Sequence, residues 1–329
     1  MTRCKSKHFA IAVAACSLMH VTGAGAANAE ADSEALVNAL NAVFGKHDGM
    51  RAAHTNGICV KGSFTPSVEA AGLSKAPQFN KGVARSVIGR FSMGGGNPDA
   101  SNAQKDNARG LAMHFDIGNG NTTDLVLLSA PVFLAKNPED FLQLLQTVAT
   151  KDGDKIGAYF KAHPEGTQQG AWLNARPVPA SYAAVTYYGV HTFTVTNAAG
   201  QKHPVKLKAI PVGGEFGLSD DEAKAKAPDF YKPELTERLA KGPAQFTLMA
   251  VLGEPGDPLD DPTAVWPEDK RKSVALGIIA IAALEADATC DAGMFDPTNL
   301  ADGVEGPKDD RVFAIRSPAY AVSLSRRAK

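Results

Sequence analysis

Two short segments, about 260 residues apart in the chain, carry side chains suited to proton transfer and to iron binding. The first runs from Arg51 to His54, and the second runs from Arg316 to Tyr320 near the end of the sequence. An imidazole can both take up and release a proton near neutral pH. A phenolate is an anionic oxygen ligand for ferric iron, and an arginine one helical turn before it can donate a hydrogen bond to its oxygen. The two segments therefore predict the two sides of an iron-containing pocket, with the histidine on the open face and the tyrosinate on the iron.

The first 29 residues have the features of a secretory signal peptide rather than of folded structure. Three basic residues precede an apolar run at 9–19, and Ala27-Asn28-Ala29 fits a cleavage site before Glu30. The run is about half of the roughly 20 residues that a membrane-spanning helix needs, so a cleaved signal explains it better than an uncleaved anchor. We therefore expect export to the periplasm, no membrane contact after the signal is removed, and a single domain at residues 30–329.

The charge of the mature chain argues against a nucleic-acid partner. The sequence has 34 Lys+Arg and 35 Asp+Glu, and loss of the signal leaves 31 against 35, a net charge near −4. No basic patch stands out, so binding to a phosphate backbone is not expected.

Two cysteines, Cys59 and Cys290, remain after the signal is removed. Cysteines in an oxidising compartment can pair, but the sequence does not show whether these two come within bonding distance. We therefore favour two free thiols over a disulfide. There is no CxxC motif, so a thioredoxin-like site is not expected.

The hydrophobic pattern predicts many strands and a few helices. An amphipathic helix is expected at 33–44, with Asp32 or Ser33 as its N-cap. Asn137 and Pro138 predict the start of another helix, and a helical stretch is expected near 218–240. The remaining regular segments are typical of strands and lie at 56–63, 84–92, 109–117, 124–129, 182–196, 203–212 and 245–252.

These strands and helical insertions predict an α+β fold, in which helices pack on an antiparallel β-barrel of about eight strands. Residues 253–310 are rich in Pro, Asp and Gly, apart from the apolar segment 274–284, and we expect them to form a long connection around the barrel. The triplet Gly94-Gly95-Gly96 lacks the GxGxxG spacing, so a nucleotide-binding loop is not expected.

The order of several motifs resembles that of the haem catalase family, in the short form called catalase-related peroxidases. The similarity extends over about residues 45–327 and rests on eight motifs in the family's order. They are Arg51 to His54, Arg90-Phe91-Ser92, Ala108-Arg109-Gly110, Asp124-Leu125-Val126 with Pro131, Tyr188-Gly189-Val190-His191-Thr192-Phe193, Asp261-Pro262-Thr263 with Val265-Trp266-Pro267, Phe295-Asp296-Pro297-Thr298-Asn299, and Arg316 to Tyr320. The resemblance implies a catalase-like haem-binding barrel with haem b as the cofactor.

The resemblance assigns catalytic roles to two residues and an iron-binding role to a third. His54 corresponds to the distal base, and Ser92 corresponds to the serine whose hydroxyl orients it. Tyr320 corresponds to the axial ligand of the haem iron, assisted by Arg316. Because proline is tolerated only in the first turn of a helix, we expect the helix that carries Tyr320 to begin just before Pro318.

Further residues correspond to positions around the haem. Three arginines match those that pair with the haem propionates, namely Arg51, Arg90 and Arg327. A guanidinium has the geometry for such a carboxylate. Phe133 and Phe141 match aromatic residues near the distal face, although an ordinary place in the core would explain them equally well. His191 matches a histidine on the proximal side, where we expect a structural hydrogen-bonding group rather than an iron ligand.

Two departures from full-length catalases narrow the expected function. Leu128 stands where the family has a distal asparagine, and a leucine cannot hold or polarise the second peroxide oxygen. This favours reduction of organic hydroperoxides with an external electron donor over catalase turnover. The chain also lacks the helical domain that follows the haem tyrosine in catalases and part of the N-terminal arm, so a monomer or a weak dimer is expected.

The sequence therefore predicts a periplasmic haem peroxidase that uses a peroxide substrate and a small-molecule electron donor and has weak catalase activity. One alternative is a hydroperoxide dehydratase or lyase resembling allene oxide synthase, which shares the barrel and would consume no donor. Another is a non-catalytic periplasmic haem-binding protein. The pairing of His54 with Ser92 argues against it, because a haem store needs no acid–base pair.

Overall fold

The computed structural model describes the backbone of residues 24–328 and the side chains of residues 33–328. The predicted signal peptide therefore lies mostly outside the described residues. The helix expected at 33–44 is longer than predicted, because α1 spans Ala24–Phe44. The expected cleavage position after Ala29 falls within this helix. At its C-terminal end, Gly45 adopts the left-handed conformation, with φ of 88°, that commonly ends a helix.

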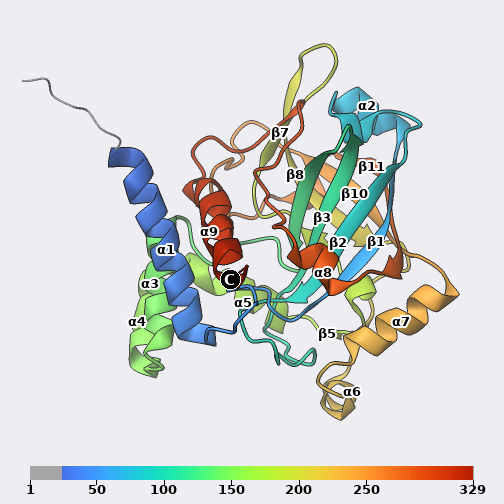
Figure 1. Cartoon of the computed structure of the whole chain (residues 1–329). Helices are drawn as coiled ribbons and strands as arrows, with labels where there is room; N and C mark the ends of the chain where they lie inside the picture. The colour runs from blue at the N-terminus through green and yellow to red at the C-terminus, as the bar shows by residue number, and fades with distance from the viewer. Residues whose placement is uncertain (1–23, 329) are drawn as a thin grey trace, which may run out of the picture.

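An antiparallel barrel forms the centre of the fold (Figure 1). Its strands follow one another in the order β10-β11-β1-β2-β3-β4-β6-β8, and β8 pairs with β10 to close the ring. The predicted barrel of about eight strands is thus confirmed for residues 24–328. The bounds of these strands are β1 Gly57–Pro66, β2 Arg85–Met93, β3 Arg109–Gly118, β4 Asn121–Leu128, β6 Tyr187–Tyr188, β8 Lys202–Pro211, β10 Ala244–Leu252 and β11 Ser273–Leu284.

Four short strands lie outside this ring. β7 (Phe193–Thr196) pairs with β8, and β12 (Val304–Glu305) pairs with β7, so the sheet continues past the barrel. β5 (Val178–Pro179) and β9 (Gly217–Leu218) form a separate two-stranded sheet.

Large apolar side chains fill the inside of the barrel. Phe64 and Phe91 are fully buried, and the ring of Phe91 stacks on that of Tyr182 with centroids 5.2 Å apart. The interior of an eight-stranded barrel is just wide enough to be filled by side chains. A cavity lined by Phe79 and Phe115 measures about 30 Å³, which is room for about one water molecule. A cofactor of the size of haem must therefore bind outside the barrel, between its wall and the helices.

One segment predicted to be a connection contains a strand, so this part of the prediction is wrong. Within residues 253–310, β11 pairs with both β1 and β10 and completes the ring. Its register against β10 shifts at Leu276, which is an extra residue on β11. Leu276 and Ile279 are both buried although they are three residues apart, because such a bulge interrupts the alternation of sides. This irregular spacing hid the strand in the sequence pattern.

Three helices gather on one side of the barrel, namely α1, α3 (Pro138–Ala149) and α9 (Arg311–Arg327) (Figure 1). α9 lies between α1 and the barrel wall. The side chain of Asn137 caps α3 by accepting a hydrogen bond from the N–H of Asp140 at 2.8 Å, as the sequence predicted. The other helices are α2 Val68–Leu73, α4 Gly153–Ala162, α5 Gln168–Asn174, α6 Asp220–Ala225, α7 Tyr231–Lys241 and α8 Asp287–Asp291, with 3₁₀ turns at Pro77–Phe79, Pro164–Thr167, Tyr182–Ala184 and Glu268–Lys270.

α9 begins about two turns earlier than predicted. Its first residue is Arg311, and Asp310 caps it by accepting a hydrogen bond from the N–H of Phe313 at 2.9 Å. Pro318 lies inside the helix and leaves the carbonyl of Ala314 without its helical donor. Ala314 is exposed, so water can bond to this carbonyl and reduce the cost of the proline.

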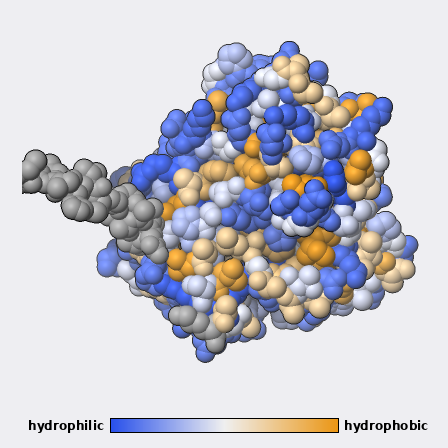
Figure 2. Space-filling model, turned by 45° about the horizontal axis from the view of Figure 1, so that its top comes forward, coloured by the Kyte–Doolittle hydropathy of each residue, from blue (hydrophilic) through white to orange (hydrophobic). Residues whose placement is uncertain are grey.

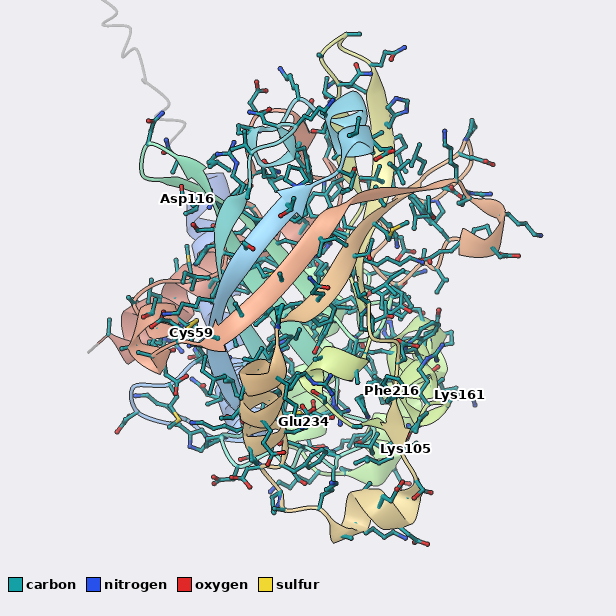
Figure 3. All side chains as sticks on the ribbon, turned by 90° about the vertical axis from the view of Figure 1, so that its right-hand side faces the viewer. Cys59, Lys105, Asp116, Lys161, Phe216 and Glu234 are labelled. Atoms are coloured by element: carbon teal, nitrogen blue, oxygen red, sulfur yellow. A yellow bond between two sulfur atoms is a disulfide. The ribbon has the colours of Figure 1, made fainter. Side chains whose placement is uncertain are left out.

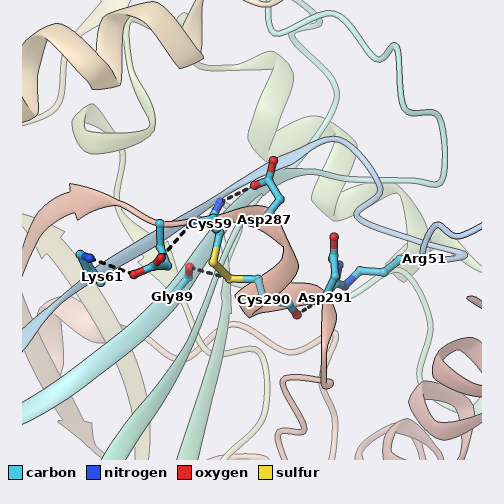
Figure 4. Close-up of a disulfide and its surroundings, with 9 residues drawn as sticks. Arg51, Cys59, Lys61, Gly89, Asp287, Cys290 and Asp291 are labelled. Carbon is cyan, nitrogen blue, oxygen red and sulfur yellow. Dashed lines mark hydrogen bonds and ion pairs between the residues drawn. A yellow bond between two sulfur atoms is a disulfide. The ribbon is translucent and has the colours of Figure 1, made fainter. Parts of the chain in front are cut away.

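Cys59 and Cys290 form a disulfide, so the expectation of two free thiols is wrong. The bond joins β1 to α8 with a Cα separation of 5.8 Å (Figure 4). The strand β11 explains the pairing. Leu284 at its end lies opposite Val60 of β1, so the residues that follow β11 reach the strand end that carries Cys59. Figure 3 shows Cys59 at one margin of the barrel, on the side opposite to Lys161 of α4 in that view.

One face of the molecule shows little continuous apolar area (Figure 2). On the face drawn in Figure 2, apolar residues form small groups among hydrophilic ones. The large apolar side chains that are exposed are Met50, Val68, Val83, Val212, Phe216, Leu259 and Val265. Within the described part of the chain, no helix combines the length and the apolar character needed to cross a bilayer.

Candidate active site

Four paired strand residues form a row across the outer face of the barrel. Ser92 of β2 pairs with Gly110 of β3, Gly110 pairs with Leu128 of β4, and Leu128 pairs with Tyr188 of β6. Residues directly opposite each other on antiparallel strands point to the same face of a sheet. Phe91, next to Ser92, belongs to the barrel core, so this row faces outwards. The row therefore places Leu128 on the same surface as the predicted catalytic serine.

His54 lies over this row. Its Nδ1 atom is 3.0 Å from the hydroxyl oxygen of Ser92. Its backbone has a φ of 56°, in the left-handed region that residues other than glycine rarely occupy. Gly110 makes room for the pair, because a Cβ atom there would lie 2.7 Å from Oγ of Ser92 and 3.0 Å from Nδ1 of His54. The structure thus brings His54 and Ser92 together and requires glycine between them.

Arg90 holds the backbone on which His54 is carried. Its Nη1 atom donates to the carbonyl of His54 at 2.6 Å, and its Nη2 atom donates to the carbonyl of Thr55 at 2.9 Å. The hydroxyl of Thr55 donates to the carbonyl of Arg51 at 2.7 Å. A strained backbone conformation persists only where surrounding contacts fix it, and these hydrogen bonds supply such contacts. Arg90 therefore orients His54, a role that the sequence did not suggest.

The surroundings keep the imidazole of His54 neutral at physiological pH. They lower the pKa of His54 to about 4, first by desolvation and then through the positive charges of Arg90, Arg316 and Arg51. Because Nδ1 faces Ser92, Nε2 is the nitrogen left to exchange a proton with a bound molecule. A neutral histidine anchored through one nitrogen can act as a base through the other.

Arg316 and Tyr320 lie one turn apart on α9. The guanidinium of Arg316 donates to the phenol oxygen of Tyr320 through Nη2 at 2.5 Å and through Nε at 3.2 Å. Two hydrogen bonds from a cation stabilise negative charge on an oxygen, as an iron-binding tyrosine requires. Ser323 lies one turn further along α9 and accepts a hydrogen bond from the N–H of Ala52. α9 is therefore held beside the segment that carries His54.

Two aspartates connect α9 to the barrel, although the sequence showed them only as parts of motifs. Asp296 accepts a hydrogen bond from the hydroxyl of Ser317 at 2.5 Å. The backbone N–H of Asp296 donates to the carboxylate of Asp124 at 2.7 Å. Since Asp124 lies on β4, four residues before Leu128, this chain of contacts joins the strand of the distal row to the helix of Tyr320. Both aspartates therefore contribute to the site by positioning it.

His191 and Asp310 form a buried pair at the start of α9. The Nδ1 atom of His191 lies 2.6 Å from the carboxylate of Asp310, which also caps the helix. The pKa of His191 is lowered because the effect of its burial outweighs that of the hydrogen bond that it donates to Asp310. The other ring nitrogen of His191 is buried and has no partner among the described residues. The sequence analysis did not identify Asp310 because it placed the start of the helix too late. An aspartate is a preferred N-cap residue, and this preference is the signal that could have identified it.

Two of the predicted propionate-binding arginines converge on the C-terminal end of α8 and the residues just after it. Arg51 pairs with the carboxylate of Asp291 and donates through Nη2 to the carbonyl of Cys290 at 2.5 Å. Arg327, the last residue of α9, donates through Nη2 to the carbonyl of Gly293. The Nε atom of Arg327 is buried and has no partner among the described residues.

Positive charge accumulates in this region. Burial, and next to it the charge of Arg51, lowers the pKa of Arg90 to about 10 and the pKa of Arg327 to about 10. Asp291 raises both pKa values in turn. Three guanidiniums thus lie near two carboxylates, Asp291 and Asp287, and the ion pair here joins Arg51 to Asp291. Buried cations without enough counter-charges suit a ligand that carries two carboxylates.

Phe133 and Phe141 lie in contact with each other, with ring centroids 4.9 Å apart. Phe141 packs on the helical side of the molecule together with Ile315, the neighbour of Arg316 on α9. The described contacts place neither ring against His54. The structure therefore places Phe141 on the side of α9, with Phe133 in contact with it. A position of the two rings at the distal face of the haem stays a prediction.

Comparisons with known proteins agree with this geometry. A family model described as Catalase matches residues 46–328. The chain is 34% identical to a catalase-related peroxidase of Synechococcus elongatus, over 100% of this chain and 99% of the relative. It is 32% identical to a catalase-related peroxidase of Mycolicibacterium paratuberculosis, over 88% of this chain and 93% of that one.

Solved structures show the same fold. A fungal catalase superposes with a TM-score of 0.76 at 22% identity and covers 86% of this chain, which spans 60% of that structure. A bacterial catalase superposes with a TM-score of 0.75 at 20% identity and also covers 86% of this chain, which spans 58% of that structure. The chain thus spans about three fifths of the length of these solved catalases.

Proposed function

Because the chain belongs to the catalase family and is an oxidoreductase that acts on peroxide, we propose that it is a haem b peroxidase that reduces organic hydroperoxides and hydrogen peroxide. A small-molecule electron donor would supply the electrons, and catalase activity would be weak. The observation that carries this proposal is that a histidine–serine pair and an arginine–tyrosine pair, far apart in the sequence, are held together by a hydrogen bond between their segments.

The donor set of the site fits a haem. The oxygen of Tyr320 receives two hydrogen bonds from Arg316, which prepares it to bind ferric iron. The arginine cluster and the unpartnered Nε atom of Arg327 suit the two propionates. When bound, haem supplies the metal centre at which peroxide is reduced and through which electrons arrive from the donor.

His54 would handle the proton of the peroxide. Its neutral Nε2 atom takes the proton from one peroxide oxygen and returns it to the oxygen that leaves as water or as an alcohol. Ser92 holds the opposite ring nitrogen, and Arg90 holds the backbone, so the imidazole keeps its orientation during both transfers. Such positioning spares the reaction the cost of orienting the base.

Leu128 supports the preference for organic hydroperoxides. It shares the outward row with Gly110, over which His54 lies, so its apolar side chain belongs to the wall beside the base. A leucine offers no hydrogen bond to the second peroxide oxygen, but it can contact an alkyl chain. Oxidation of a second hydrogen peroxide molecule would then be slow, and an external donor would be needed.

The test compares donor oxidation by haem-loaded protein with hydrogen peroxide and with an alkyl hydroperoxide. His54→Ala should retain haem and slow the reaction with peroxide by about 100-fold or more, which is typical of a lost acid–base group. His203→Ala, which changes a histidine of β8 outside the site, is the matched control. Consumption of donor together with release of the alcohol supports the peroxidase. An epoxide or aldehyde formed without donor consumption would support a dehydratase or lyase, and equal rates in His54→Ala and the parent would contradict a catalytic site.

We also propose that the protein is exported to the periplasm as a single domain and is a monomer or a weak dimer. The disulfide supports export, because such bonds persist mainly in oxidising compartments. Sequencing of the protein recovered from periplasm should give Glu30 as the first residue. Light scattering after size-exclusion chromatography should report the mass of one chain, or of a dimer that dissociates on dilution.

A further inference from the structure

The Cys59–Cys290 disulfide lies next to the contacts of Arg51, which pairs with Asp291 and donates to the carbonyl of Cys290 (Figure 4). We propose that this disulfide positions Arg51 and Arg327 and thereby controls how tightly haem is retained. The inference rests on the proposed function, because it takes these arginines to be the partners of the haem carboxylates.

The segment that carries Cys290 is short, and the disulfide is its covalent link to the barrel. α8 spans Asp287–Asp291, no side chain caps its N-terminus, and Cys290 is its buried residue. A helix of about one turn is not stable by itself. Two hydrogen bonds assist the disulfide: the N–H of Cys59 donates to the carboxylate of Asp287 at 3.3 Å, and the N–H of Glu285 donates to the carbonyl of Cys59 at 2.9 Å. These three connections run to the same residue of β1, Lys61 of β1 also pairs with the carboxylate of Glu285, and the disulfide is the covalent link.

The same segment holds the two arginines. Cys290 supplies both the sulfur bonded to Cys59 and the carbonyl that accepts from Arg51 at 2.5 Å. Its neighbour Asp291 pairs with Arg51, and the carbonyl of Gly293 accepts from Arg327. A displacement of Cys290 would therefore displace the acceptors of both guanidiniums. Arg51 lies three residues before His54, so a displacement of Arg51 would also shift the segment that carries His54.

The proposal makes haem retention depend on the redox state of the cysteines. Formation of the bond removes two electrons and two protons from the thiols and passes them to a disulfide oxidant, which leaves as a dithiol. A dithiol reductant reverses the exchange and regenerates both thiols. Cys59 and Cys290 are buried, so a reductant reaches them only when the segment opens. A chain that is kept reduced would accordingly bind haem loosely, and oxidation would secure the cofactor.

The test measures the rate at which haem leaves the protein, by transfer to an excess of an apo-globin scavenger. Cys59→Ala/Cys290→Ala should release haem about tenfold faster or more than the parent, because charge-assisted hydrogen bonds lose their fixed acceptors. The measurement is made far below the thermal transition of each protein, so that loss of global stability alone does not change it. Should the double variant fail to fold, the parent treated with dithiothreitol provides the same comparison, with free thiols counted beside haem release.

A double-mutant cycle separates positioning from general stabilisation. Arg51→Gln should speed haem loss clearly in the disulfide-bonded protein and only slightly in the cysteine-free one. Arg311→Gln, which removes an exposed arginine at the start of α9 that pairs with Glu139, should have the same small effect in both. Equal effects of Arg51→Gln in both backgrounds, or unchanged release from the cysteine-free protein, would overturn the proposal and leave the peroxidase assignment intact. A parent protein that binds no haem would instead refute the proposed function.

Discussion

The backbone N–H of Ala52 donates a hydrogen bond to the hydroxyl of Ser323 across 3.2 Å. Ala52 lies two residues before His54, and Ser323 lies one turn after Tyr320 on α9. The bond therefore links the loop of the distal base to the helix of the iron ligand, although they are separated by most of the chain. A pocket with one wall on each element can form only when α9 docks against this loop. The distance between the distal base and the iron ligand therefore depends on how α9 packs against this loop.

The assignment of Tyr320 as iron ligand leads to the first prediction. Tyr320→Phe keeps the ring and removes the oxygen, so the protein should lose most of its haem or show a changed optical spectrum. Spectra of the purified variant and of Tyr159→Phe, a tyrosine of α4, should be compared at equal protein concentration. Full haem content with an unchanged spectrum in Tyr320→Phe would show that another group binds the iron.

The second prediction concerns Arg316. Arg316→Leu removes both hydrogen bonds to the phenol oxygen, so the iron–oxygen bond should weaken and haem affinity should fall by about tenfold or more. Arg311→Leu, which removes an exposed arginine of the same helix, is the matched control. Haem titration of the apo-proteins measures both. Indistinguishable affinities for the two variants would remove the proposed role of Arg316.

The third prediction concerns pH. The pKa of His54 is lowered to about 4, so the folded protein keeps this histidine neutral well below its ordinary range. A base acts only while it is unprotonated, hence the rate of reaction with peroxide should stay constant from about pH 8 to about pH 5 and fall as the pH drops through about 4. Stopped-flow spectra can follow this rate, with haem content checked at each pH. His54→Gln should lack the acid limb, and a half-loss of the parent's rate near pH 6.5 would contradict the argument.

The sequence predicted the barrel because most strands carry regular signals. β3 alternates buried and more exposed residues from Leu111 to Asp116, and Asn137 marks the start of α3 with an ordinary capping pattern. The resemblance to the haem catalase family, which rests on motifs in the family's order, pointed to His54, Ser92 and Tyr320. These features depend on neighbours along the chain, and local patterns can report them.

The features that the sequence analysis did not predict depend on contacts between distant segments of the chain. The bulge at Leu276 disturbed the alternation of β11, and without that strand nothing indicated that Cys290 would reach Cys59. Pro318 argued for a short terminal helix, but the packing of α9 against α1 and the barrel tolerates it. Asp310 was missed for the same reason. Long-range packing overrode a local preference in each case.

Asp310 carries the fourth prediction. Asp310→Ala removes the N-cap of α9, which costs about 0.5–2 kcal/mol, and leaves the buried ring of His191 without its partner, which costs about 1–3 kcal/mol. We expect the free energy of unfolding to fall by about 1.5–5 kcal/mol in total. Asp310→Asn retains an oxygen for the cap and for the imidazole and should lose less. Urea unfolding of both variants measures the difference, and equal losses would argue against the double role.

Leu128 carries the last prediction. If its apolar side chain suppresses catalase turnover, Leu128→Asn should raise oxygen release from hydrogen peroxide relative to donor oxidation. The row from Ser92 through Gly110 to Leu128 places the new amide on the surface over which His54 lies, where it could bind the second peroxide oxygen. Burying an amide without partners costs about 1–3 kcal/mol, but Leu128 is only partly buried, so water or bound peroxide can reduce this cost.

The matched control is Leu128→Met, which changes the shape of the side chain and keeps it apolar. An oxygen electrode and a peroxidase assay on the same haem-loaded preparation give the ratio of the two activities. A higher ratio in Leu128→Asn and an unchanged ratio in Leu128→Met would assign the effect to the amide. Equal ratios in all three proteins would show that Leu128 does not divide peroxide between the two reactions. The preference would then have to arise where the substrate approaches the iron.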